Sequence, residues 1–303
     1  MGILKCENVH KNINNKEILK NINFELNKNE IVGLVGPNGA GKTTLMKLMV
    51  GLSSITQGKI KLNNFDVDQE FLKYIKEVGA IIEVPIFYPS LTGLQCLKYY
   101  AKLRNVDKDS LSKTIQLVGL ENSINSKVKT YSLGMRQRLG VAQAIMTNPK
   151  LLILDEPFNG LDPSGVSELR KILINTKSSG ATVFISSHTL SELEIICDRV
   201  IFMNEGKILK VESLKENKNS GMKMILKTTD NLTSVKLIEK EYPEILVKTS
   251  NDKMHLEKLK PSIFTEILIL LKSSNIEILE MEEFKETLQH TFNTIIGGGE
   301  HDE

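Results

Sequence analysis

The sequence predicts an α/β protein with a parallel core sheet, followed by a smaller α+β domain. Three observations carry this prediction. Short apolar runs such as Leu151–Leu154 and Thr182–Ser186 alternate with helical segments, as strands buried on both faces of a parallel sheet do. The chain has 303 residues, a length that favours two domains. Residues 215–221 are rich in Lys, Asn and Ser without hydrophobic periodicity, so we expect a linker there.

Composition excludes several classes of protein. The chain has 39 Lys and Arg against 37 Asp and Glu, and its net charge of +2 offers no basic field for nucleic acid. Its 3 Cys lack Cys-x-x-Cys spacing, which argues against a disulfide framework or a zinc site and favours a reducing, cytosolic setting. No apolar run approaches the roughly 18 residues of a membrane-spanning helix. The N-terminus lacks the apolar region of a signal peptide.

The first domain is expected to span residues 1–214. Residues 1–30 alternate apolar and polar positions, which indicates half-buried antiparallel strands. The apolar strand Ile31–Val35 runs into glycines and is followed by a helical stretch at Thr43–Val50. Residues 90–148 are mostly helical in pattern, and we expect them to form a helical subdomain that ends before a proline.

The second domain is expected over residues 222–296, before a flexible tail at 297–303. Its pattern runs strand, helix, strand, strand, helix, strand and a final helix, which is the ferredoxin-like split order. An Asn-Asp turn separates the two middle strands. The expected elements are strand Met222–Thr228, helix Ser234–Glu241, strands Ile245–Lys248 and Lys253–Leu259, helix Pro261–Lys272, strand Ile276–Met281 and helix Phe284–Ile296.

A glycine-rich phosphate loop lies between the strand Ile31–Val35 and the helix after it. The glycines allow successive backbone N–H groups to point at phosphate oxygens, and the start of the helix adds positive charge. Lys42 is expected to reach the β- and γ-phosphates of a nucleotide, and the Thr43 hydroxyl to ligate Mg²⁺. The alternative is a glycine-rich turn with a chance lysine, but the flanking strand and helix favour the phosphate loop. The loop satisfies the pattern G-x-x-x-x-G-K-[ST] and consists of Gly36, Pro37, Asn38, Gly39, Ala40, Gly41, Lys42, Thr43 and Thr44.

Two carboxylates follow the apolar strand Leu151–Leu154. Asp155 and Glu156 come at its C-terminal end, which is the edge where α/β sheets place their ligands. Asp155 can hold Mg²⁺ through water, and Glu156 can polarise an attacking water. Taken alone, the segment could also be a strand that runs into an acidic turn.

Three further segments each have an ordinary interpretation when taken alone. The segment Tyr131–Met135 precedes a helical run at Arg138–Thr147, where a serine is usually a helix cap. The same cap geometry can also bind phosphate oxygens. His188 follows the strand Thr182–Ser186 and would by default be a surface histidine. The segment Asn159–Asp162 would by default be a turn.

The order and spacing of these segments resemble the ATP-binding cassette of ABC transporters over residues 2–211. The resemblance implies an ATPase that uses ATP and Mg²⁺, with Asp155 and Glu156 as its catalytic pair. It also implies that two cassettes enclose ATP between them, so that the signature sequence acts in trans on the nucleotide of the partner. The matching positions are the phosphate loop Gly36–Thr44, the degenerate signature residues Ser132, Leu133, Gly134 and Met135, the D-loop residue Asp162 and the switch histidine His188.

Two positions depart from the family pattern near the nucleotide. Where the family usually has an aromatic residue that stacks on adenine, this chain has Ile13, which can pack on the base without stacking. Where the family has a glutamine that touches Mg²⁺, this chain has Glu83, which keeps an oxygen ligand but adds a charge. We therefore include Glu83 among the catalytic and metal-binding candidates. The alternative is an ordinary exposed glutamate, and Gln95 is a poor substitute because it falls in the next helical segment.

The Glu83 loop, together with Tyr88–Gly93 and Ser132–Arg138, looks like the lantibiotic self-protection transporters and their bacitracin-resistance relatives. The C-terminal part is also similar to that group near Thr287–Gly299. This resemblance implies the energy subunit of an exporter, peripheral on the inner face of the cell membrane. The implied partners are a second copy of the cassette and separate integral membrane permease subunits. Nucleic acid is not expected as a partner.

Three alternatives remain open at this point. An exporter of another substrate, such as sodium, a drug or a polysaccharide, would share these motifs because the cassette never touches the cargo. A soluble ATPase of the same superfamily that acts on ribosomes or DNA would usually have two cassettes in one chain or long coiled coils. A non-catalytic nucleotide sensor would account for Glu83 and Ile13, but not for the intact Lys42, Asp155 and Glu156.

Overall fold

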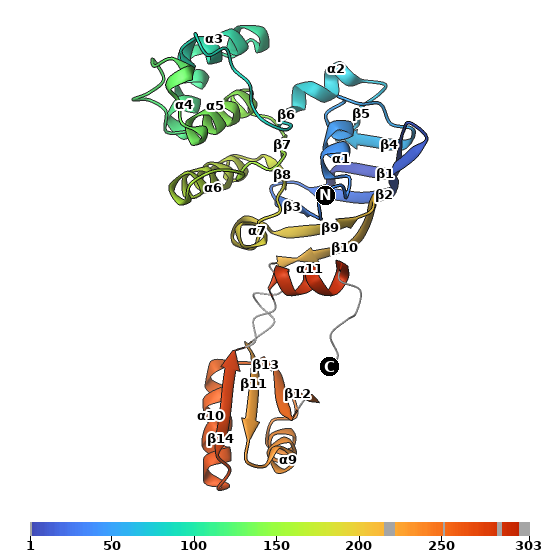
Figure 1. The fold of residues 1–303 in the computed structure, drawn as a ribbon, viewed down its shortest axis with the longest axis vertical. Coiled ribbons are helices and arrows are strands. Elements are labelled where there is room, and N and C mark those ends of the chain that lie inside the picture. Colours follow the sequence, from blue (N-terminus) through green and yellow to red (C-terminus); the bar gives the residue numbers. More distant parts are fainter. Residues whose placement is uncertain (1, 215–221, 251, 284–286, 297–303) are drawn as a thin grey trace. The chain divides into compact units, whose positions relative to one another are not determined.

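The computed structural model describes residues 2–214, 222–250, 252–283 and 287–296 (Figure 1). The chain divides into two compact units, with the boundary between Glu212 and Ser213 and with Ile295 and Ile296 grouped with the first unit. The boundary predicted from the sequence, between residues 214 and 215, lies two residues later. The linker expected at 215–221 and the tail expected at 297–303 lie outside the described residues. Within the described part of the chain, no helix is long and apolar enough to cross a membrane.

The alternating pattern of residues 1–30 forms two antiparallel strands, as predicted. They belong to a four-stranded sheet with the order β2-β1-β4-β5. The turn between β1 and β2 consists of Asn14 and Asn15, whose φ angles of 48° and 62° are both positive. Two such residues make the tight hairpin that matches the twist of the strands, and asparagine tolerates this conformation. The strands are β1 (Gly2–Ile13), β2 (Lys16–Asn27), β4 (Gln57–Leu62) and β5 (Phe65–Asp66).

The core sheet has six strands in the order β10-β9-β3-β8-β7-β6, and the five strands from β9 to β6 pair in parallel. Every residue of β3, β7 and β8 is buried, which explains their continuous apolar sequences. The short β6 and the half-exposed β10 were not predicted; β6 has only the four-residue run Val-Gly-Ala-Ile, and most positions of β10 are exposed. The strands are β3 (Ile31–Val35), β6 (Val78–Ile81), β7 (Leu151–Leu154), β8 (Thr182–Ser186), β9 (Arg199–Asn204) and β10 (Lys207–Ser213).

The helices of the first unit form two groups. Figure 1 shows α3, α4 and α5 together, apart from α1, which lies near the antiparallel strands. The helix predicted at Arg138–Thr147 is wrong at its start: α5 begins at Leu133, because the Ser132 side chain caps it. The helices are α1 (Lys42–Met49), α2 (Phe71–Tyr74), α3 (Gly93–Arg104), α4 (Lys108–Leu117), α5 (Leu133–Ile145), α6 (Pro163–Ser178) and α7 (Leu190–Ile196), with short 3₁₀ turns at Ile75–Glu77 and Val128–Thr130.

The strand order brings distant parts of the sequence to one edge of the core sheet. Strand β8 lies between β3 and β7 and pairs in parallel with both, and β7 pairs in parallel with β6. Their carboxyl ends therefore lie side by side. The segments that leave these four ends are the phosphate loop after β3, the Glu83 loop after β6, the Asp155-Glu156 pair after β7 and the His188 loop after β8.

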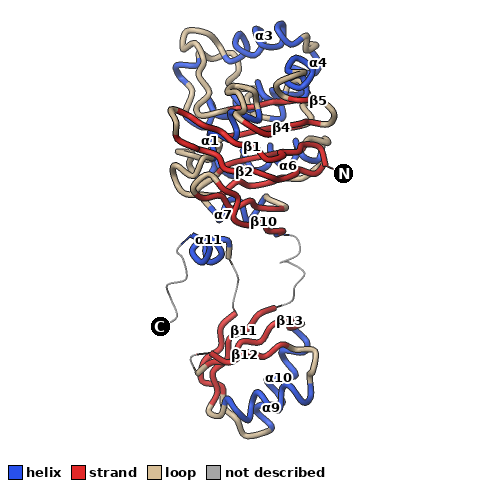
Figure 2. The backbone as a smooth tube through the Cα atoms, turned by 90° about the vertical axis from the view of Figure 1, so that its right-hand side faces the viewer, coloured by secondary structure: helices blue, strands red, loops and turns tan. Residues whose placement is uncertain are grey.

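The second unit has the ferredoxin-like order that its sequence predicts (Figure 2). Its antiparallel sheet has the order β12-β13-β11-β14, and both α9 and α10 contribute to its core. The structure differs at the ends of several elements: α9 begins earlier because Asp230 caps it, β12 and β14 are shifted toward the C-terminus, and α11 begins at Leu288. Residues 284–286, where the last helix was expected to begin, lie outside the described residues. The elements that follow residue 221 are β11 (Met222–Thr228), α9 (Asn231–Glu241), β12 (Leu246–Ser250), β13 (Lys253–Leu259), α10 (Pro261–Ser273), β14 (Ile278–Glu283) and α11 (Leu288–Ile296).

Candidate nucleotide-binding and hydrolysis site

The phosphate loop has a backbone that requires glycine at specific positions. Gly39 and Gly41 have positive φ angles of 83° and 105°, which other residues rarely adopt. A Cβ on Gly36 would lie 2.2 Å from the carbonyl oxygen of Met203, so no larger residue fits there. Helix α1 begins at Lys42, and the N–H groups of its first turn have no partner within the helix. The loop therefore presents backbone donors and the positive end of a helix to an anion.

Lys42 is the cation of this loop. Its Nζ donates to the carbonyl oxygen of Gly36 at 2.6 Å and to that of Pro37 at 3.3 Å. The same atom lies 3.9 Å from Oε1 of Glu156. Burial lowers the pKa of Lys42, while the negative charges of Glu156 and Asp155 act to raise it. Because the Lys42 side chain is already held in place, it can pair with the phosphates of a nucleotide with little further loss of conformational entropy.

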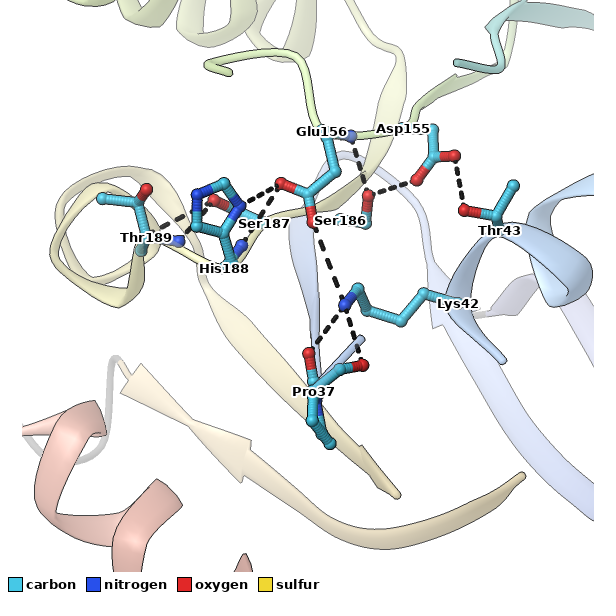
Figure 3. Close-up of polar contacts among 10 residues, drawn as sticks. Pro37, Lys42, Thr43, Asp155, Glu156, Ser186, Ser187, His188 and Thr189 are labelled. Atoms are coloured by element: carbon cyan, nitrogen blue, oxygen red, sulfur yellow. Dashed lines mark hydrogen bonds and ion pairs between the residues drawn. The ribbon is translucent and has the colours of Figure 1, made fainter. Parts of the chain in front are cut away.

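Thr43 and Asp155 are brought together at the start of α1. The Thr43 hydroxyl donates to Asp155 Oδ2 at 2.8 Å, and the Ser186 hydroxyl donates to Asp155 Oδ1 at 2.6 Å (Figure 3). Hydroxyl and carboxylate oxygens are the donors that Mg²⁺ prefers, so these two residues fit a Mg²⁺ ion bound with nucleotide phosphates. The described residues contain no cluster of three or more His, Cys, Asp or Glu side chains that could hold a metal alone. Phosphates and water would have to complete the coordination.

Glu156 and His188 form a second contact at the same sheet edge. His188 Nδ1 lies 2.7 Å from Glu156 Oε2, and the backbone N–H of His188 donates to the same oxygen at 3.3 Å. Glu156 has a positive φ of 47°, which is uncommon for a residue with a Cβ. Its other carboxylate oxygen, Oε1, faces Lys42 (Figure 3). The arrangement leaves one oxygen of Glu156 directed toward the place where Lys42 would hold a phosphate.

Glu83 pairs with Lys47, whereas a metal-binding role would place it beside Thr43 and Asp155. Its Oε1 accepts a hydrogen bond from Lys47 Nζ at 2.7 Å, and the two side chains are 63% and 40% exposed. Lys47 lies one helical turn after Thr43 on α1. Glu83 is thus close to the phosphate loop, but none of the contacts among the described residues joins it to Thr43 or Asp155. Gln95 belongs to the capping box of α3.

Ile13 is the last residue of β1, directly before the Asn14-Asn15 turn. Its side chain is 43% exposed. It is therefore accessible to a ligand at the outer edge of the antiparallel sheet, as a residue that packs on a nucleotide base has to be.

The signature residues and the D-loop form a separate cluster. Ser132 Oγ accepts from the backbone N–H of Met135 at 3.2 Å, and Asp162 Oδ1 caps α6 by accepting from the backbone N–H of Gly165 at 3.0 Å. A Cβ on Gly160 would lie 2.8 Å from Leu133 Cδ2, so the two segments touch. Across the described chain, no hydrogen bond or ion pair joins these residues to Lys42, Thr43 or Asp155.

Two residues of the site were not predicted from the sequence. Ser186 ends a buried strand, and Lys47 lies in a helix whose pattern indicates packing. A signal existed for each, because Ser186 is two residues before His188 and Lys47 is four residues after Thr43. Only the strand order shows that Ser186 lies beside Asp155, and only the loop after β6 shows that Lys47 faces Glu83.

Comparison with known proteins shows the family to which the chain belongs. The ABC transporter family model matches residues 19–159. The bacitracin transport ATP-binding protein BcrA of Enterococcus faecalis is 37% identical over 300 residues, which cover 98% of this chain and 97% of that protein. The lantibiotic transport ATP-binding protein SrtF of Streptococcus pyogenes is 42% identical over 207 residues, covering 68% of this chain and 89% of that protein.

A solved structure with the same fold is cbiO1 from Clostridium perfringens, part of the ABC transporter complex cbiONQ. It aligns with a TM-score of 0.65 and 27% identity, covering 80% of this chain and 96% of that one. The resemblance found in the sequence motifs is therefore confirmed at the level of the fold and along nearly the whole chain. The chain belongs to the family of ABC transporter ATP-binding proteins, which bind and hydrolyse ATP.

Proposed function

We propose that this chain powers an exporter that protects the cell against a lantibiotic or a related antimicrobial peptide. The observation that carries the proposal is the extent of the similarity to the bacitracin transport protein BcrA, which covers 98% of this chain and so includes the second unit. The similarity to the lantibiotic transport protein SrtF supports the same class of cargo. Separate membrane subunits would form the transport path, with this chain against their cytoplasmic side.

The first unit has the groups that ATP hydrolysis requires. The phosphate loop and Lys42 bind the phosphates, and Thr43 and Asp155 would hold Mg²⁺. Bound Mg²⁺ neutralises charge on the β- and γ-phosphates. Glu156 acts on the attacking water: His188 occupies its Oε2, which leaves Oε1 to accept the proton on the side that faces Lys42. Ile13 packs on the base, and Glu83 is the candidate oxygen ligand from the β6 loop.

The separation of the two clusters supports a dimer of cassettes. Leu133, next to the cap residue Ser132, lies against Gly160 of the D-loop segment, and no hydrogen bond among the described residues joins Ser132 to Lys42. The start of a helix is suited to bind phosphate oxygens, but this one needs a nucleotide held by another molecule. A second copy of this chain would supply that nucleotide, with Ser132, Leu133, Gly134 and Met135 acting in trans and Asp162 near the interface.

Large apolar side chains are exposed between β6 and the end of α3, next to Glu83. Concentrations of exposed apolar residues mark surfaces that bind other proteins. This segment is the place where we expect the permease to dock and where the β6 loop would transmit the state of the nucleotide. The exposed residues are Val84, Ile86, Tyr88, Tyr99 and Leu103.

The cargo is tested by resistance. One strain of a peptide-sensitive bacterium expresses the chain with the membrane subunits encoded next to its gene. A second strain expresses the Glu156→Gln variant with the same subunits. The proposal predicts that the parent raises the inhibitory concentration of a lantibiotic or bacitracin and that the variant does not. Equal sensitivity of both strains to these peptides, with ATP-dependent tolerance of sodium or another compound instead, would contradict the peptide cargo while leaving the ATPase assignment intact.

A further inference from the structure

Ser186 joins the two residues that follow β7, Asp155 and Glu156. It is the last residue of β8, and its side chain is fully buried. Its hydroxyl donates to Asp155 Oδ1 at 2.6 Å and accepts from the backbone N–H of Glu156 at 2.8 Å (Figure 3). One hydroxyl therefore donates to one and accepts from the other of two consecutive residues that directly follow the neighbouring strand β7.

The hydrogen bond from Ser186 fixes the orientation of the Asp155 carboxylate. Ser186 occupies Oδ1, and Thr43 donates to Oδ2. Because each oxygen has its own partner, rotation of the carboxylate would break two hydrogen bonds in a buried place, where unpaired polar groups are costly. The orientation leaves Oδ2 on the side of the phosphate loop.

The contact with Glu156 supports an unusual backbone. The positive φ of 47° at Glu156 is a conformation that residues with a Cβ keep only where their surroundings hold them. Ser186 holds its backbone N–H, and His188 holds its carboxylate. The direction of Glu156 Oε1 toward Lys42 depends on both contacts.

We propose that Ser186 is a positioning residue for ATP hydrolysis, which orients Asp155 toward Mg²⁺ and holds Glu156 toward the attacking water. The inference rests on the proposed roles of Asp155 and Glu156. Ser186 acts through these two residues, because its hydroxyl bonds to both of them. Groups that orient metal ligands and bases typically change metal affinity or activity by about 10- to 100-fold when they are removed.

A matched control exists on the same strand. Thr182 begins β8 and is also fully buried, and its hydroxyl also makes two hydrogen bonds, accepting from Asn29 N–H at 3.1 Å and donating to the Asn27 carbonyl at 2.8 Å. Thr182→Val removes these bonds at the end of the strand that faces away from the site. Any loss caused only by a buried hydroxyl missing from β8 would appear in this variant too.

The experiment compares Ser186→Ala, Ser186→Cys and Thr182→Val with the parent chain. Thermal unfolding gives the stability, steady-state kinetics give kcat and KM for ATP, and a fluorescent ATP analogue titrated against Mg²⁺ gives the metal dependence of binding. We expect Ser186→Ala to lower kcat by about 10- to 100-fold and to raise the half-saturating Mg²⁺ concentration by about 10-fold. Thr182→Val should keep kcat within about twofold of the parent even if its melting temperature falls as far as that of Ser186→Ala.

Ser186→Cys keeps the size of the side chain but offers only a weak donor and acceptor, so it should lose activity while remaining folded. It decides the question if the alanine variant does not fold. The inference is overturned if the Ser186 variants keep the parent kcat and Mg²⁺ dependence, or if Thr182→Val loses the same activity. Glu156→Gln separates this inference from the proposed function: parent-like hydrolysis by that variant removes the base assignment, whereas an inactive Glu156→Gln beside an active Ser186→Ala removes only the role of Ser186.

Discussion

Glu156 is contacted by three residues from two segments that lie far from it in the sequence. Lys42 comes from the phosphate loop, Ser186 ends β8, and His188 follows two residues later. Each contact acts on a different atom of Glu156, namely Oε1, the backbone nitrogen and Oε2. At the residue scale, residues outside its own strand thus set the position and direction of the Glu156 carboxylate. Such contacts would keep the proposed base in place.

The contact between His188 and Glu156 predicts a loss of turnover when the imidazole is removed. His188→Ala leaves only the 3.3 Å backbone contact to Glu156 Oε2, so the carboxylate gains rotational freedom. We expect kcat to fall by about 10- to 100-fold with little change in KM for ATP. His10→Ala is the control, because His10 Nδ1 makes a similar 2.9 Å contact with Glu17 away from the site. Equal kcat values for the two variants would contradict the role of His188.

The pair between Lys47 and Glu83 predicts a small stability effect, because both side chains are largely exposed. A double-mutant cycle with Lys47→Met and Glu83→Gln, measured by urea unfolding, should give a coupling energy of about 0.2–1 kcal/mol. The coupling should decrease at about 1 M salt, where charges on the surface are screened. A larger coupling that does not respond to salt would mean that the pair is buried in solution and that Glu83 is not free to approach a metal.

At the scale of elements, the parallel pairing of β3, β8, β7 and β6 explains why the motifs meet. The apolar sequences of β3, β7 and β8 predict buried strands, and the polar residues directly after them could be assigned to one sheet edge. The start of α5 could not be placed in the same way. Hydrophobic periodicity indicates Arg138–Thr147, whereas the cap at Ser132 moves the start forward to Leu133.

The two functions of Ser132 can be separated by comparing two helix caps. Ser132 caps α5, and Asp107 caps α4 by accepting from the backbone N–H of Ser110 at 2.8 Å. Alanine at either position should lower the free energy of unfolding by about 0.5–2 kcal/mol. Only Ser132→Ala should also lower the ATPase rate, since Ser132 is the residue proposed to act on the nucleotide of the partner. Loss of activity in Asp107→Ala to the same degree would show that the cap matters only through stability.

At the scale of the whole molecule, the sequence predicts both folds better than it predicts their contacts. The βαββαβ order of the second unit follows from its strand and helix patterns, although the caps at its helix starts shift the boundaries. The phosphate loop, Asp155, Glu156 and His188 are recognisable from motifs because their chemistry requires those residue types. Ser186 and Lys47 have no such motif, because their roles come from neighbours that only the folded chain brings together.

The three cysteines report on the integrity of the first unit. Cys6, Cys96 and Cys197 are free and buried, and burial raises the pKa of each thiol above its usual value. A raised pKa lowers the fraction of reactive thiolate at pH 8. The native chain should therefore react slowly with a thiol reagent, and all three cysteines should react rapidly in denaturant. A thiol in the native chain that reacts as fast as a free cysteine would contradict the packing described for its strand or helix.

The rate of ATP hydrolysis by Glu156→Gln is the most direct measurement of the proposed mechanism. The substitution keeps the size of the side chain and removes its ability to accept a proton from water. We predict that hydrolysis falls by about 100- to 10,000-fold while ATP still binds in the presence of Mg²⁺. Hydrolysis at the parent rate by a folded, ATP-binding Glu156→Gln chain would show that another group activates the water, and it would contradict the arrangement of Glu156 between Lys42, Ser186 and His188 as the catalytic centre.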